Sequence, residues 1–148
     1  HQKKSIRKEA CWTVSNITAG NNAQVGAVIK ANLIPPLVNI MSKAEFDVKK
    51  EACWAIANAL SGGTAQQKDF LISQGIVDPL SQIMKTNLDP KIVLVALDAL
   101  EQCLRHGKEY SFKYNGENKV SDFLEECGGL DIIEELQRHD NEEIYEKT

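Results

Sequence analysis

The stretch KEACWTVSN at residues 8–16 recurs almost unchanged as KEACWAIAN at residues 50–58. A shift of 42 residues aligns residues 6–20 with residues 48–62, including the Glu, Trp, Asn and Gly of each copy. A period of this length is typical of repeat proteins, in which helical units stack and bury their apolar faces against one another. The duplicated stretch therefore predicts an all-α fold made of repeats.

The repeat continues along the chain with small changes of spacing. An offset of 43 places Leu97 opposite Trp54 and Glu101 opposite Asn58, and an offset of 53 follows an insertion near residues 107–119. We predict one solenoid with these parts: the last helix of one repeat at 1–20, a repeat at 21–62, a repeat at 63–107 and an incomplete terminal repeat at 108–148.

Each unit is predicted to contain three helices, because no stretch alternates in the manner of a strand. In the first complete unit we expect them at residues 22–31, 36–43 and 46–60. Apolar residues at every fourth position of the third helix predict a buried stripe, formed by Val48, Ala52, Ile56 and Leu60. Five glycines are expected at helix ends: Gly20, Gly62, Gly75, Gly107 and Gly128.

Both ends of the chain fall inside a unit. Residues 1–20 supply only a third helix, and NEEIYEKT at residues 141–148 begins another. Since a solenoid needs polar capping repeats, we expect the sequence to be a piece of a longer solenoid.

The composition shows no sign of an enzyme, a metal site or a membrane span. No apolar run approaches the ~20 residues that cross a bilayer, and the four cysteines lack a C-x-x-C pair. We therefore expect no disulfide framework, no zinc site and no cofactor. The same cysteine pattern predicts a protein of a reducing intracellular compartment. Cys103 and His106 could form a thiol–imidazole pair, but a buried cysteine beside a helix-terminal histidine is the favoured interpretation.

The repeated stretch carries the candidate binding site. On a helix, a Glu three residues before a Trp and an Asn four residues after it project from one side. Asn can bond to a peptide main chain, parallel Trp side chains can enclose the stem of a Lys or Arg, and Glu can bind its cationic head. The alternative is that the tryptophans are core residues. The candidates are Glu9, Trp12 and Asn16 in the first copy and Glu51, Trp54 and Asn58 in the second.

The end of the chain is acidic. Residues 117–148 carry a net charge of −8, so residues 1–116 carry +4. The acidic residues either form solvated helix faces or attract a basic partner. The candidates for a partner surface are Glu125, Glu126, Asp131, Glu134 and Glu135.

The stretches KEACWTVSNITAG, EACWAIANALSGG, IPPLV, AEFDVKKEA and HDNEEIYEK together resemble the importin-α (karyopherin-α) family over essentially the whole chain. The resemblance implies armadillo repeats in a right-handed superhelix, from the third helix of the seventh repeat through most of the tenth. It implies that the Trp/Asn pairs form the minor site for Lys/Arg-rich nuclear localisation signals. Ser15 is a further candidate there, where the second copy has Ala57.

The same resemblance implies the partners and the location. An adaptor of this family shuttles between cytoplasm and nucleus in protein transport, and its C-terminal repeats dock a recycling export receptor and a nucleoporin that promotes cargo release. Importin-β would bind only through an N-terminal segment outside this sequence. Neither nucleic acid nor membrane is an expected partner.

A generic armadillo scaffold is the alternative function. Such a scaffold would bind acidic peptides with basic residues, whereas the repeated face here carries Glu, Trp and Asn. The charge of the bound peptide discriminates between the two, and turnover that is lost in Cys103→Ala would indicate an enzyme instead.

Overall fold

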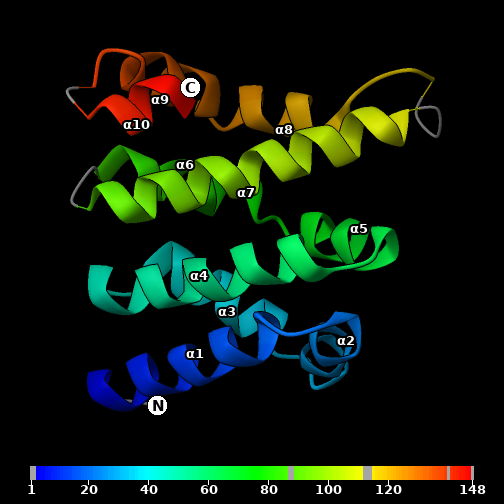
Figure 1. The fold of residues 1–148 in the computed structure, drawn as a ribbon, viewed down its shortest axis with the longest axis vertical. Helices are drawn as coiled ribbons and strands as arrows, with labels where there is room; N and C mark the ends of the chain where they lie inside the picture. Colours follow the sequence, from blue (N-terminus) through cyan, green and yellow to red (C-terminus); the bar gives the residue numbers. More distant parts are fainter. Residues whose placement is uncertain (1–2, 87–88, 112–114, 140, 148) are drawn as a thin grey trace. The chain divides into compact units, whose positions relative to one another are not determined.

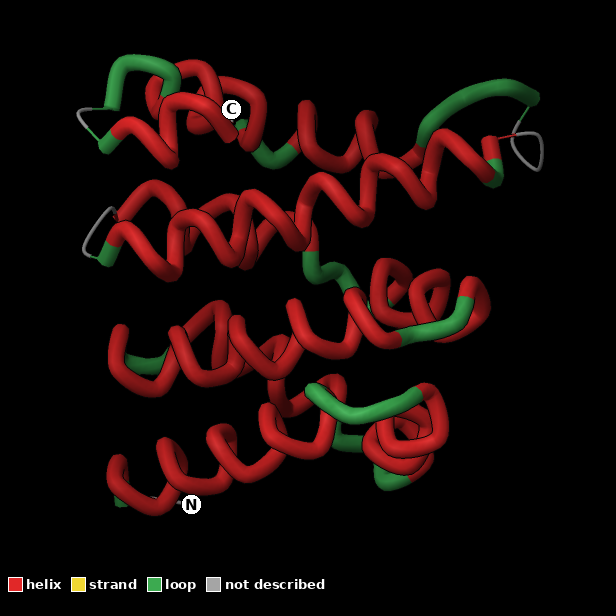
Figure 2. Tube along the Cα trace, in the orientation of Figure 1, coloured by secondary structure: helices red, strands yellow, loops and turns green. Residues whose placement is uncertain are grey.

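The computed structural model describes residues 3–86, 89–111, 115–139 and 141–147, and within these ranges every regular element is a helix (Figures 1 and 2). The predicted all-α fold is confirmed. The helices are α1 (Lys4–Thr18), α2 (Asn22–Lys30), α3 (Ile34–Lys43), α4 (Phe46–Gly62), α5 (Ala65–Ser73), α6 (Val77–Thr86), α7 (Pro90–Glu109), α8 (Lys119–Glu126), α9 (Gly129–Leu136) and α10 (Glu142–Lys147).

The chain divides into two compact units, residues 1–76 and residues 77–148. The first contains α1 to α5 and the second α6 to α10. None of the described helices alone is long and apolar enough to cross a membrane; α2 and α3 pass that test only as a pair, which is bent by 83°.

In the first unit α1 and α4 lie side by side, and α3 packs against α4 (Figure 1). The core lies between these helices, and the predicted stripe along α4 is confirmed. Its four residues, Val48, Ala52, Ile56 and Leu60, have no solvent exposure.

Two helices of the first unit begin with the same capping arrangement. The side chain of Asn21 accepts from the backbone N–H of Gln24 and Thr64 accepts from Gln67, while each Gln side chain accepts the N–H of its cap residue. This reciprocal pairing satisfies donors that a helix N-terminus leaves free. Gln67 Nε2 also donates to the Asn22 carbonyl over 2.9 Å, which ties α5 to α2.

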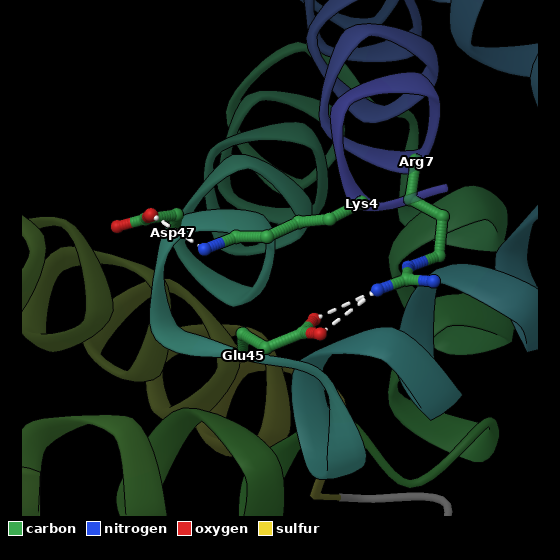
Figure 3. Close-up of polar contacts among 4 residues, drawn as sticks. All are labelled: Lys4, Arg7, Glu45 and Asp47. Atoms are coloured by element: carbon green, nitrogen blue, oxygen red, sulfur yellow. Dashed lines mark hydrogen bonds and ion pairs between the residues drawn. The ribbon is translucent and has the colours of Figure 1, made fainter. Parts of the chain in front are cut away.

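Ion pairs link the first turns of α1 and α4 (Figure 3). The Arg7 guanidinium donates to both carboxylate oxygens of Glu45 over 2.9 and 3.0 Å, and Lys4 Nζ lies 3.0 Å from Asp47 Oδ2. The pKa of the Asp47 carboxyl is lowered, chiefly by its hydrogen bond to Lys4. The pKa of Glu45 is also lowered, by a bond to its own backbone N–H and then by Arg7.

In the second unit α6 and α7 pack together, α8 and α9 pack against α6, and α10 packs against α7. The last helix is anchored by Ile144, which is fully buried. The first turn of α7 begins with Pro90, which tolerates that position because its missing N–H needs no partner there.

One glycine does not end a helix as predicted. Gly107 lies inside α7, which continues to Glu109. A methyl group at this position would overlap with Asn118 Oδ1 and lie 3.0 Å from Val120 Cγ2. Gly107 is therefore required for the close approach of the start of α8, rather than for helix termination.

The predicted register of the third helices is wrong by one residue after α4. Leu97 was aligned with the exposed Trp54, but it is buried, whereas Asp98 is exposed. α3 and α6 begin 43 residues apart, at Ile34 and Val77, but α4 and α7 begin 44 apart, at Phe46 and Pro90. The connection before α7 is thus one residue longer, so Asp98 takes the position of Trp54 and Gln102 that of Asn58.

Candidate functional site

The two tryptophans of the repeated stretch lie on the surface of the first unit. Trp12 on α1 is 52% exposed and Trp54 on α4 is 41% exposed. Neither indole is a core residue, so the core alternative does not hold. Because α1 and α4 are adjacent, equivalent positions on them are about 8–10 Å apart. Exposed aromatic side chains at that spacing can flank a ligand side chain.

The two asparagines differ in their surroundings. Asn16 is exposed, whereas Asn58 is half-buried and its Nδ2 donates to the Ser15 carbonyl of α1 over 3.1 Å. An amide has two N–H donors and one carbonyl acceptor. Asn58 therefore bridges the two helices, and this contact uses only one of its two N–H donors and leaves its carbonyl acceptor unused.

Ser15 contributes its carbonyl rather than its hydroxyl. The residue is buried, and its Oγ donates to the Trp12 carbonyl over 2.6 Å. Its own carbonyl accepts from Ala19 N at 3.0 Å, from Thr18 Oγ1 at 3.1 Å and from Asn58. The structure thus places the Ser15 hydroxyl inside α1 and away from the surface that carries Trp12.

The two glutamates complete the face. Glu9 is exposed and Glu51 is half-exposed, and within the described residues neither carboxylate forms an ion pair. Glu51 lies close enough to α1 to raise the pKa of the Cys11 thiol, in addition to the larger effect of burial. Both carboxylates can therefore accept a cation from a ligand. We call Glu9, Trp12, Asn16, Glu51, Trp54 and Asn58 the clamp face.

The acidic candidates lie on two adjacent helices of the second unit. Glu125 and Glu126 are on α8, and Asp131, Glu134 and Glu135 are on α9; all five are exposed. Two large apolar residues on the same helices, Phe123 and Leu130, are 45% and 46% exposed. The sequence pattern did not single these two out, because an isolated apolar residue on a short helix has no periodic partner.

The described residues offer little other chemistry. No group of three or more His, Cys, Asp or Glu side chains among them could hold a metal ion. Cys11, Cys53 and Cys103 are buried and Cys127 is half-buried, and none of the four forms a disulfide. Burial raises the pKa of Cys53 to about 12, which makes it a poor nucleophile.

Comparison with known proteins identifies the family. The model for the armadillo/beta-catenin-like repeat matches residues 21–61 and 64–105, and the model for an atypical Arm repeat matches residues 118–148. The chain belongs to the armadillo-repeat family.

The relatives also confirm the resemblance to importin-α. The chain is 52% identical to importin subunit alpha-4 of Arabidopsis thaliana and 51% identical to importin subunit alpha-1b of Oryza sativa subsp. japonica, in each case over 100% of this chain. It spans 28% of the length of each. A designed armadillo repeat protein in complex with the peptide (KR)4 matches 99% of this chain and 56% of its own, with a TM-score of 0.80 and 34% identity.

Proposed function

We propose that the clamp face binds an extended Lys/Arg-rich peptide, as part of a nuclear import adaptor. The observation that carries this proposal is the pair of exposed tryptophans at equivalent positions on adjacent helices, each with a Glu and an Asn beside it. Exposed aromatic side chains that are grouped on adjacent helices are typical of an interaction site, because they combine a large apolar surface with a polar edge.

The chemistry of the clamp face suits such a ligand. The stem of a Lys or Arg can lie between Trp12 and Trp54, where its cation gains about 0.5–2 kcal/mol over an indole face. Glu51 can accept the cationic head through a charge-assisted hydrogen bond. Asn side chains can bond the ligand main chain whatever its sequence. A similar fold that holds (KR)4, in the designed protein, supports this assignment.

Substitution of one tryptophan tests the proposal. We expect Trp54→Ala to weaken a Lys/Arg-rich peptide by about 1–2 kcal/mol, measured by calorimetry, because stem packing and the cation–π contact are lost. Phe123→Ala is the matched control, since Phe123 is an exposed aromatic residue of the second unit. It should leave affinity unchanged.

An acidic peptide of equal length provides the second arm. Binding of the acidic peptide with comparable affinity would favour the generic scaffold. Full affinity in a folded Trp54→Ala chain would show that the tryptophans do not hold the ligand.

The whole protein is proposed to shuttle between cytoplasm and nucleus, with cargo bound on the clamp face. The exposed acids of α8 and α9 are proposed to dock the recycling export receptor. The C-terminal repeats are proposed to bind a nucleoporin that promotes cargo release. A set of like charges on two adjacent helices attracts a basic surface over about a Debye length.

Charge reversal tests the acidic surface. We expect Glu134→Lys with Glu135→Lys to weaken capture of the export receptor, more strongly at low salt, because attraction becomes repulsion. Glu109→Lys changes an exposed acid at the end of α7 and is the control. Equal capture by all three proteins would mean that the acids are only solvated.

A further inference from the structure

The side chain of Lys147 lies between two carboxylates of a neighbouring helix. Its Nζ on α10 is 2.5 Å from Asp98 Oδ1 and 2.8 Å from Glu101 Oε2, both on α7. Arg105 Nη2 holds the second oxygen of Glu101 at 2.5 Å. Hydrogen bonds to Asp98 and then to Glu101 raise the pKa of Lys147, and the hydrogen bond from Lys147 is the largest cause of the lowered pKa of Glu101. Both groups are therefore charged at neutral pH.

The register of the helices shows what these positions correspond to. α4, α7 and α10 begin at Phe46, Pro90 and Glu142. Counted from these starts, Lys147 takes the position of Glu51, and the buried Ile144 takes that of the buried Val48, which supports the alignment.

One of the two acids takes a position that belongs to the clamp face in the first unit. Counted in the same way, Asp98 on α7 corresponds to Trp12 on α1, and Glu101 corresponds to Ser15. Thus α7 has a carboxylate where α1 has the Trp12 indole, and α10 has a cation where α4 has the Glu51 carboxylate.

We propose that Lys147 is a resident cation that occupies Asp98 and Glu101 and so keeps the Lys and Arg side chains of a ligand from binding there. The inference rests on the proposed function, because it concerns where the basic ligand can bind. A tethered amino group competes with any free one at an effective concentration on the order of millimolar. Lys147 therefore acts as a specificity-determining residue that removes Asp98 and Glu101 as a binding site for the cations of the ligand.

Amide shift mapping of the full 148-residue chain tests the proposal, with a blocked Lys-Arg-Lys-Arg tetrapeptide as the probe. In the wild type we expect shifts in α1 and α4 and none in α7. Lys147→Ala should add shifts at Asp98 and Glu101, whereas Lys147→Arg should behave as the wild type. Lys119→Ala breaks the ion pair with Glu117 in the same unit and is the matched control, expected to resemble the wild type.

The proposal would be overturned by α7 shifts in the wild type as large as those in Lys147→Ala, or by no α7 shift in a folded Lys147→Ala chain. Adding Asp98→Asn and Glu101→Gln to Lys147→Ala should abolish the new shifts, and their persistence would also overturn it. Absence of shifts in α1 and α4 with α7 shifts present in Lys147→Ala would reject the proposed clamp face and leave this inference standing.

Discussion

At the scale of single residues, the Ser15 carbonyl on α1 links the two helices of the clamp face, because it accepts a hydrogen bond from Asn58 on α4. A carbonyl oxygen has two lone pairs, yet this one accepts from Ala19, Thr18 and Asn58. It lies in the last turn of α1, where carbonyl oxygens carry the negative end of the helix dipole. The contact orients the Asn58 amide, with its nitrogen toward α1, before any ligand binds.

Exchanging this amide for a carboxylate tests the bridge. In Asn58→Asp the donor becomes an acceptor that faces the Ser15 carbonyl, so we expect a loss of about 1–3 kcal/mol in the free energy of unfolding. Asn16→Asp makes the same charge change at an exposed position and should stay within about 0.5 kcal/mol. Urea unfolding followed by tryptophan fluorescence measures both, and equal losses would contradict the bridging role.

At the scale of elements, the two ion pairs at the start of α1 and α4 give the stability of the first unit a small dependence on acid. The folded pKa values of Glu45 and Asp47 are lowered, so their contribution is present above the ordinary values of 4.5 and 3.8. It is lost as the pH falls through the folded pKa, where both carboxyls become protonated.

Neutral variants isolate this contribution. Glu45→Gln with Asp47→Asn should lower the urea midpoint only slightly at about pH 7, since exposed ion pairs contribute little. At about pH 2 the midpoint should equal that of the wild type, because both carboxyls are then protonated. The control is Glu9→Gln, which neutralises an exposed acid on α1. A difference from wild type that persists undiminished in acid would show that the substitutions act through something other than charge.

The helices themselves could be predicted from the sequence because their signals are local. The apolar spacing around Val48 and the proline near the start of α3 predicted element positions to within about two residues. The role of Gly107 could not be predicted, since it depends on Asn118, which reaches it only in the fold. The register at Leu97 failed because the offset of 43, set by residues 34–41 and 77–84, was carried through a connection that is one residue longer before α7.

At the scale of the whole molecule, the clamp face was predictable because the repeat duplicates its residues. The Lys147 contacts were not, because Lys147 meets Asp98 and Glu101 across separate helices and has no duplicate in the sequence. The exposed carboxylates of α8 and α9 could be anticipated from charge alone, and their role remains a proposal.

Each unit has its own core, and this predicts how a local defect spreads. The core of the first unit is built by α1, α3 and α4, and that of the second by α6 and α7 with the helices packed on them. In stacked repeats, stability is a sum of terms for each unit and for its neighbours. A defect in one unit should therefore increase local unfolding in that unit before it affects the other unit.

Gly107→Ala supplies such a defect. The added methyl group would overlap with Asn118 Oδ1, which accepts the Val120 and Ser121 N–H groups as the cap of α8. We expect a destabilisation of roughly 1–3 kcal/mol from overpacking, reduced by the ~1 kcal/mol helix preference of Ala over Gly. Hydrogen exchange should accelerate in α7 and α8 while α4 keeps its protection.

The matched control is the other glycine inside a helix, in the first unit. A methyl group on Gly26 of α2 meets only Gln67 Nε2, at 3.2 Å, so Gly26→Ala should leave exchange in α7 and α8 unchanged. Equal acceleration of α4 and α7 in Gly107→Ala would mean that the two units unfold as one, because the defect would then open both cores together.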